Sequence, residues 1–147
     1  MTDECKFSDV QFSAKLAGEG RWPTTMAELV TGWISYERNE HRQPKGLDQE
    51  DIWAMFCAHE LVEDHANLGL DFVLSVLATK LDNDVIPILA AGPLEEVLAY
   101  HGPVIIDRIE DEARRSPDFC HLLGGVWQNR MPDEIWQRVR RAAPNRW

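Results

Sequence analysis

The sequence predicts an all-α fold, an irregular bundle of about six to seven helices, on two observations. From Thr24 onward, apolar residues recur at three- and four-residue spacing, and short turns rich in Pro, Gly or Asp separate the periodic segments. Helices joined by such short turns would also suit stacked antiparallel hairpins of the HEAT type, but no repeat of fixed period is visible. We therefore expect strands in less than about a tenth of the chain, all within the first twenty residues.

The first two helices are predicted from their starts. In "TTMAELVTGWISYERN" the apolar residues keep helical spacing, and Thr24 or Thr25 is suited to cap the helix because its hydroxyl can accept a hydrogen bond from the first turn. After a polar loop, Asp48 is expected to cap a second helix that runs to about His65. Asp51 then falls in its first turn, where negative charge favours the helix dipole.

The later helices are marked by proline and glycine. A helix is predicted over residues 70–81, ending at an Asp-Asn-Asp cluster, and its inward residues are expected to be Phe72, Val73, Val76 and Leu77. In "AAGPLEEVLAYHG", Pro93 is expected at the first helical position, Glu95 and Glu96 at the positive end of the helix, and Gly102 at a left-handed stop. Three further helices are expected to begin at Pro103, Pro117 and Pro132.

The stretch "LLGGVWQNRMPDEIW" allows two interpretations. In the first, Gly124 and Gly125 end one helix or let a neighbour approach closely, and Trp127 covers the junction to the next helix. In the second, the segment lines a ligand pocket. We favour packing, and so expect Trp53, Trp127 and Trp136 to be largely buried and Trp127→Ala to cost about 3–5 kcal/mol.

Length and composition indicate one soluble helical domain. The chain has 147 residues, 44% of them hydrophobic and 27% charged, which is typical of a globular domain with its own core. We expect a single domain over residues 1–147, in which residues 1–23 form an N-terminal arm suited to a short helix or a strand-like segment.

The same composition predicts a cytoplasmic protein. No apolar stretch approaches the roughly 20 residues that cross a bilayer, and the N-terminus is acidic where a secretory signal would be basic. The three cysteines, Cys5, Cys57 and Cys120, are widely spaced and outside any Cys-x-x-Cys pattern, so we expect reduced thiols. We expect no membrane partner, no metal and no cofactor.

Charge is unevenly distributed along the chain. The net charge of −10 disfavours nucleic acid as a partner, because phosphates are bound mainly by Lys and Arg. Residues 46–79 contain no Lys or Arg but seven acids, whereas the last twenty residues contain five Arg against two acids. This segregation either joins two parts of the fold or presents an acidic face to a protein with a basic surface. The residues proposed for such an acidic face are Asp48, Asp51, Glu63 and Asp64.

The segment "HELVEDH" holds the candidates for chemistry. His59 and Glu63 share a helix face and could supply two metal ligands, but the zinc-protease pattern needs a His where Glu63 stands. Glu60 falls within the apolar stripe of its helix, so it should form a buried or half-buried ion pair with an arginine of the C-terminal helices, or act as a general base. No second patterned carboxylate and no Ser-His-Asp or Cys-His set accompanies it, so no catalytic residue is assigned.

Three phrases, "AAGPLEEVLAYHG", "IEDEARRSPDF" and "LLGGVWQNRMPDEIW", resemble a family of small bacterial proteins known only as a domain of unknown function. The resemblance covers about residues 48–142. It implies a helical fold and a bacterial or phage origin, and it supplies no activity and no site residues.

Two functions from different classes follow. The first is a non-enzymatic protein-binding module, such as an immunity protein or inhibitor from a bacterial or phage conflict system, as small size, acidity and missing catalytic patterns suggest. The alternative is a small hydrolase or metal-dependent enzyme centred on Glu60, His59 and Glu63. A homodimer with structural duties, using Trp136 and Trp147, is a third hypothesis.

Overall fold

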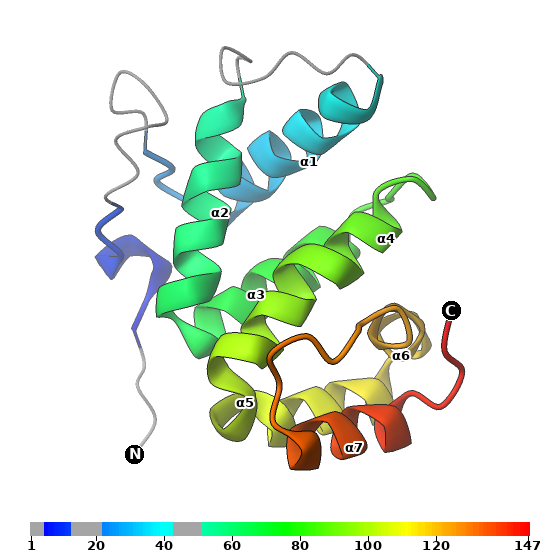
Figure 1. Cartoon of the computed structure of the whole chain (residues 1–147). Helices are drawn as coiled ribbons and strands as arrows, with labels where there is room; N and C mark the ends of the chain where they lie inside the picture. Colours follow the sequence, from blue (N-terminus) through cyan, green and yellow to red (C-terminus); the bar gives the residue numbers. More distant parts are fainter. Residues whose placement is uncertain (1–4, 13–21, 43–50) are drawn as a thin grey trace. The chain divides into compact units, whose positions relative to one another are not determined.

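The computed structural model describes residues 5–12, 22–42 and 51–147, and all regular structure in these ranges is helical (Figure 1). No strand occurs in the described ranges, which confirms the all-α prediction. The chain divides into two compact units, Met1–Val76 and Leu77–Trp147, each described here by itself. The expectation of one domain over 1–147 stays a prediction. None of the described helices combines the length and apolar character needed to cross a membrane.

The first unit contains a short 3-10 helix, η1 (Phe7–Asp9), followed by α1 (Met26–Arg42), α2 (Ile52–Asp64) and α3 (Ala66–Leu77), whose end marks the boundary between the units. In this unit α1 packs against α2 (Figure 1). The ring of Trp33 on α1 meets that of Phe72 on α3 edge to face, with centroids 5.7 Å apart.

The start of α1 agrees with the sequence. The Thr25 hydroxyl accepts a hydrogen bond from the Glu28 backbone N–H at 3.1 Å, and the Glu28 carboxylate accepts one from the Thr24 N–H at 3.2 Å. The predicted cap of α2, Asp48, lies outside the described residues. Asp51 precedes α2 instead of lying in its first turn, so that placement was wrong.

The predicted inward positions of α3 are mostly confirmed, but its bounds are shifted. Phe72, Val73 and Val76 are buried, whereas Leu77 is half-buried. The helix occupies Ala66–Leu77, not residues 70–81, because residues 66–69 continue the apolar periodicity and Leu68 is itself buried.

The second unit contains α4 (Ile86–Leu89), a π-helical turn η4 (Ala90–Leu94), α5 (Glu95–Arg115), α6 (Pro117–Leu123) and α7 (Asp133–Ala142). Both α6 and α7 pack against α5, and α7 lies alongside the second half of α5 (Figure 1). The predicted start at Ser116-Pro117 is confirmed, since the Ser116 hydroxyl accepts a hydrogen bond from the Phe119 N–H at 3.1 Å.

The predicted break between two helices at Gly102-Pro103 is confirmed, because two helical stretches meet at a kink within α5. Gly102 does not adopt the left-handed conformation that was expected. Pro93 lies inside the π turn instead of at the first helical position, and Pro103 follows the kink. Because proline cannot donate a backbone hydrogen bond, each is accommodated locally, the first by the wide turn and the second by a kink at His101 (φ −131°, ψ 17°). Gly102 permits close packing, because a Cβ there would lie 3.1 Å from the Ile135 side chain on α7.

One of the three tryptophan predictions was wrong. Trp53 is 3% exposed as expected and Trp136 is half-buried, whereas Trp127 is 71% exposed. Trp127 is exposed because α6 ends at Leu123, so helical spacing no longer applies to the residues that follow it. Val126 is buried, and the next side chain, Trp127, faces solvent.

Gly124 and Gly125 are approached by the C-terminal segment, not by a neighbouring helix. The indole ring of Trp147 packs on Gly125, where a Cβ would lie 2.5 Å from the ring, and the Trp147 N–H donates to the Gly124 carbonyl at 3.2 Å. A Cβ on Gly124 would collide with the backbone carbonyl of Asn145. The two glycines therefore let residues 144–147 pack against the end of α6.

We expect Gly124→Ala to lower the free energy of unfolding by about 1–3 kcal/mol, because the added methyl group forces the backbone at Asn145 to move. Gly92→Ala is the matched control, since a Cβ there has no heavy atom within 4 Å, and its effect should be within about 0.5 kcal/mol. Chemical denaturation of both variants measures the difference. Equal stabilities would mean that residues 144–147 do not pack on Gly124.

Candidate functional site

The acidic residues predicted to form a binding face lie at both ends of α2. Glu63 and Asp64 are exposed at its C-terminal end. Asp51, at the N-terminal end, is half-buried and accepts a hydrogen bond from the Ser35 hydroxyl at 2.6 Å. Asp48 lies outside the described residues. Glu63 and Asp64, which we call the acidic end of α2, are therefore the exposed members among the three of these residues that the structure describes.

The predicted pairing of His59 with Glu63 on one helix face is confirmed. The His59 Nε2 lies 3.8 Å from a Glu63 carboxylate oxygen, and about half of each side chain is exposed. Among the described residues, no group of three or more His, Cys, Asp or Glu side chains is placed to hold a metal ion. The pair alone provides two ligands, whereas a structural zinc site uses four and a catalytic one three.

Glu60 is half-buried and acts electrostatically on Cys57. Burial, and to a lesser extent the negative charge of Glu60, raises the pKa of the Cys57 thiol to about 12. Cys57 is therefore protonated at neutral pH and is a core residue, not a nucleophile. The proposed ion pair between Glu60 and a C-terminal arginine would join the two units and stays a prediction.

Charge is balanced very differently in the two units. Residues 1–76 carry six basic and 14 acidic residues, a net charge of −8, whereas residues 77–147 carry nine basic and 11 acidic residues, a net charge of −2. The first unit therefore holds most of the negative charge of the chain.

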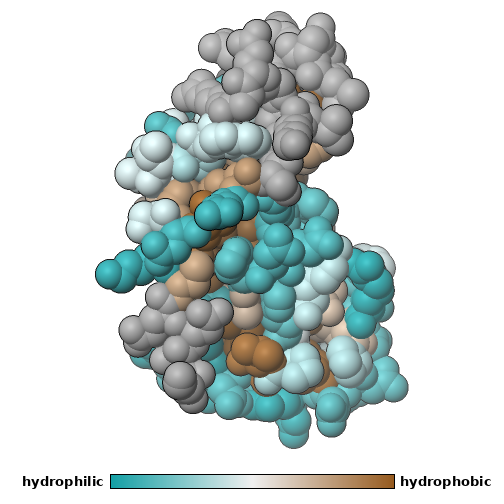
Figure 2. Space-filling model, turned by 90° about the vertical axis from the view of Figure 1, so that its left-hand side faces the viewer, coloured by the Kyte–Doolittle hydropathy of each residue, from teal (hydrophilic) through white to brown (hydrophobic). Residues whose placement is uncertain are grey.

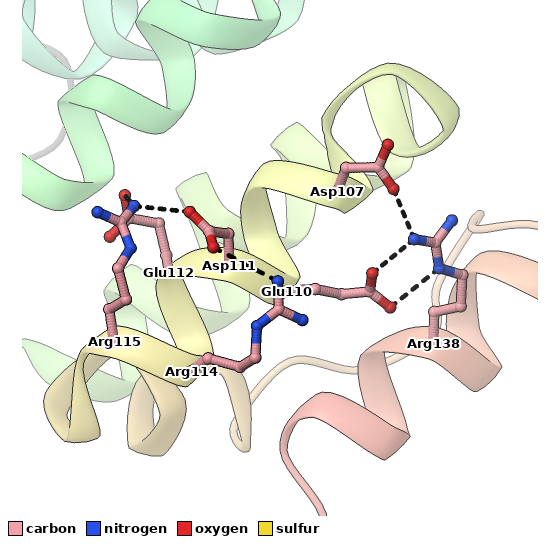
Figure 3. A network of polar contacts seen from close by, with 7 residues as sticks. All are labelled: Asp107, Glu110, Asp111, Glu112, Arg114, Arg115 and Arg138. Atoms are coloured by element: carbon pink, nitrogen blue, oxygen red, sulfur yellow. Dashed lines mark hydrogen bonds and ion pairs between the residues drawn. The ribbon is translucent and has the colours of Figure 1, made fainter.

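In the second unit, four acids of α5 pair with arginines of the same unit (Figure 3). Arg138 of α7 contacts Asp107 at 2.6 Å and Glu110 at 2.5 Å on α5. The hydrogen bond from Arg138 is the main cause that lowers the pKa of Glu110. One turn further along α5, Arg115 pairs with both Asp111 and Glu112 at 2.9 Å. Arg138 thus pairs within its own unit.

A cleft lies between the loop after α6, α7 and the C-terminal segment, and four of its lining residues belong to the stretch "LLGGVWQNRMPDEIW", for which a ligand pocket was the less favoured interpretation. Its volume is about 440 Å³, within the range of small-molecule pockets. Its walls are Val126, Trp127, Gln128, Trp136, Arg146 and Trp147. We call it the tryptophan cleft, because three of its six lining residues are tryptophans.

A buried carboxylate positions one wall of this cleft. Glu95, at the start of α5, is 8% exposed and accepts hydrogen bonds from the Trp127 backbone N–H at 3.2 Å and the Asn129 side-chain amide at 3.0 Å. Asn129 has a positive φ of 50°, a conformation that Asn adopts more readily than most residues. Glu95 therefore fixes the loop that carries the exposed Trp127.

Arg146 and Trp147 form the opposite wall. The Arg146 guanidinium donates to the carbonyls of Leu123 and Ala143, each at 3.3 Å, and to that of Val126. It also lies over the Trp136 ring, 4.9 Å from the centroid.

The Trp147 ring is fixed by two contacts with His121. It stacks on the His121 ring at 5.2 Å, and its indole N–H donates to the His121 carbonyl at 2.7 Å. This wall is therefore held by polar and ring contacts before any ligand arrives.

The positive charge of Arg146 is not compensated by a nearby acid. Among the described residues, no Asp or Glu side chain lines the cleft beside Arg146. Burial, and secondarily the charge of Arg140, lowers the pKa of Arg146 below its ordinary value. The cleft is therefore aromatic and cationic.

Elsewhere, hydrophobic residues reach the surface in separate patches. On the face drawn in Figure 2, most of the described surface is hydrophilic, with brown patches between teal regions. The described large hydrophobic residues that are exposed are Trp22, Tyr100, Val104, Trp127 and Trp147. Trp127 and Trp147 stand out from the others because they line the same cleft.

Comparison with known proteins gives one match. A family described as "Family of unknown function (DUF6869)" matches residues 41–146. No curated protein and no solved structure matches the chain.

Proposed function

We propose that this chain, which belongs to the DUF6869 family of unknown function, is a non-enzymatic protein-binding module for a partner with a basic surface. The observation that carries the proposal is the charge asymmetry between the units, −8 against −2. An immunity protein or inhibitor of a basic toxin would use such a surface to accelerate association.

The acidic end of α2 is the part of this surface that suits docking. Glu63 and Asp64 are exposed, and no Lys or Arg lies between residues 46 and 79 to neutralise them locally. By contrast, Glu110 of the second unit already pairs with Arg138. An acid that is paired with a basic side chain contributes little to the electrostatic potential around the protein. An exposed acid without a Lys or Arg nearby attracts a cationic partner.

The enzyme alternative has less support. His59 and Glu63 lie together, but both are about half exposed in a shallow surface setting where a metal ion would keep most of its water. A general base needs a pocket that excludes water, and the cleft with the most aromatic walls lies in the other unit, away from Glu60 in the sequence.

The test begins with a search of the neighbouring genes for a basic protein as the candidate partner, whose association rate is then measured. We expect the Glu63→Lys, Asp64→Lys double variant to associate about tenfold more slowly at low salt, with a smaller change in the dissociation rate. The difference should shrink at physiological salt, where charges are screened within about 8 Å. Melting temperature should stay near that of the parent, because exposed charges contribute little to stability.

A matched control makes the same change of net charge elsewhere. Asp84 and Asp118 are exposed acids of the second unit, so Asp84→Lys, Asp118→Lys alters the total charge equally. Its association rate should remain close to that of the parent. If both double variants slow association equally, only net charge matters and the acidic end of α2 is not the docking surface.

A further inference from the structure

The tryptophan cleft is built before any ligand arrives. Trp127 is positioned through its backbone N–H by Glu95, and Trp147 through its indole N–H by the His121 carbonyl. Even so, Trp127 remains 71% exposed and Trp147 46% exposed. Exposed indole rings give a ligand large apolar contact, and the entropy cost is reduced at Trp147, whose ring is already held by His121.

Arg146 adds a charged group to these aromatic walls. A guanidinium has five N–H donors, and the backbone carbonyls of Leu123, Ala143 and Val126 take three of those of Arg146. These carbonyls orient the group but do not neutralise it. Two donors and a full positive charge therefore remain for an acceptor within the cleft.

We propose that the tryptophan cleft binds a small organic anion, with its flat apolar body against the indole rings of Trp127 and Trp147 and its carboxylate on Arg146. This site is independent of the acidic end of α2, because all its residues belong to the second unit.

A cationic ligand fits the same walls less well. Aromatic rings do attract organic cations, but the face of Trp136 is already covered by the Arg146 guanidinium at 4.9 Å. A second cation in the cleft would be repelled by that guanidinium, and the described lining residues include no Asp or Glu side chain to balance it. Charge complementarity therefore selects an anion.

Three probes of the same shape test the selection of charge. They are 3-phenylpropanoate, its neutral amide 3-phenylpropanamide, and the cation 3-phenylpropylammonium. Binding is followed by heteronuclear NMR of the tryptophan indole N–H groups, which resolves the cleft from Trp22, Trp33 and Trp53. We expect the carboxylate to bind with a dissociation constant of about 1 mM or lower, and the amide about tenfold more weakly. Only the resonances of Trp127, Trp136 and Trp147 should shift.

Variants identify the groups responsible. Trp127→Ala should weaken binding of 3-phenylpropanoate about tenfold and leave the fold intact, because its ring is mostly exposed. Arg146→Gln should abolish the preference for carboxylate over amide, and Arg146→Lys should retain part of it. Trp22→Ala, at an exposed tryptophan of the first unit, is the matched control and should bind as the parent does.

Several results would overturn the proposal. These are equal affinity for the carboxylate and the amide, tighter binding of the ammonium, unchanged binding by Trp127→Ala, or no shift of the three indole resonances at about ten times the expected dissociation constant. Because the parent protein alone distinguishes the three probes, the charge preference is measured even if an Arg146 variant fails to fold.

Discussion

Replacing Trp53 by alanine is expected to lower the free energy of unfolding by about 3–5 kcal/mol, the range typical of a large core residue truncated to a methyl group. Trp53 is 3% exposed at the start of α2. Its ring lies on Gly32 of α1 so closely that a Cβ on Gly32 would come within 2.7 Å of it. The substitution leaves a cavity at the contact between α1 and α2, and these backbones cannot close it without shifting.

Trp127→Ala is the matched control, because it removes the same side chain from a position that is 71% exposed. We expect its effect on unfolding to lie within about 0.5 kcal/mol, as for most surface substitutions. Urea denaturation followed by far-ultraviolet circular dichroism measures both variants. Similar losses for the two would contradict the solvent-facing position of Trp127.

The contrast between these two tryptophans shows where helical periodicity in the sequence predicts burial and where it does not. Trp53 lies within a continuous helical period, so its spacing from neighbouring apolar residues places it on the buried side. Trp127 follows two glycines and the end of α6, where no period connects it to the helix before. The spacing of apolar residues therefore predicts which side chains are buried only within a continuous helix.

Helix ends were predictable where a side chain satisfies the backbone. Thr25 and Ser116 both accept a hydrogen bond three residues ahead, and this local pattern can be recognised in the sequence. The break near Gly102 was also predictable, because Gly102-Pro103 marks it in the sequence and the kink lies at His101. The contact between Gly102 and Ile135 of α7 was not predictable, because the two residues lie far apart in the chain.

The tryptophan cleft shows the same limit. The pairing of His59 with Glu63 was predictable because helical geometry fixes it. The cleft is formed by residues from two loops and α7, and Arg146 and Trp147 reach it through contacts with the end of α6. One signal was available, namely that three of the six tryptophans and five arginines lie in the last 21 residues of the 147.

The residue that connects fold and cleft is Glu95, and Glu95→Ala is expected to lower the free energy of unfolding by about 3 kcal/mol. Sequence reasoning placed this acid in the first turn of a helix, where a surface charge contributes only a few tenths of a kcal/mol. In the structure it is 8% exposed and accepts from the Trp127 N–H and the Asn129 amide. Alanine would leave the Trp127 N–H without its acceptor, and hydrogen bonds to charged groups are the costly ones to remove.

Two substitutions make that expectation specific. Glu95→Gln retains one oxygen for the Trp127 N–H, so its loss should be about 1 kcal/mol. Glu134→Ala removes an exposed acid from the first turn of α7 and should change stability by a few tenths of a kcal/mol. Hydrogen exchange gives an independent readout, because the Trp127 amide should lose its protection in Glu95→Ala and keep it in Glu134→Ala. The proposed role of Glu95 would be contradicted if Glu95→Ala and Glu134→Ala lost equally little stability and the Trp127 amide stayed protected in both. Glu95 would then act only as a charge at the end of a helix, and the loop that carries Trp127 would be positioned by the C-terminal segment alone.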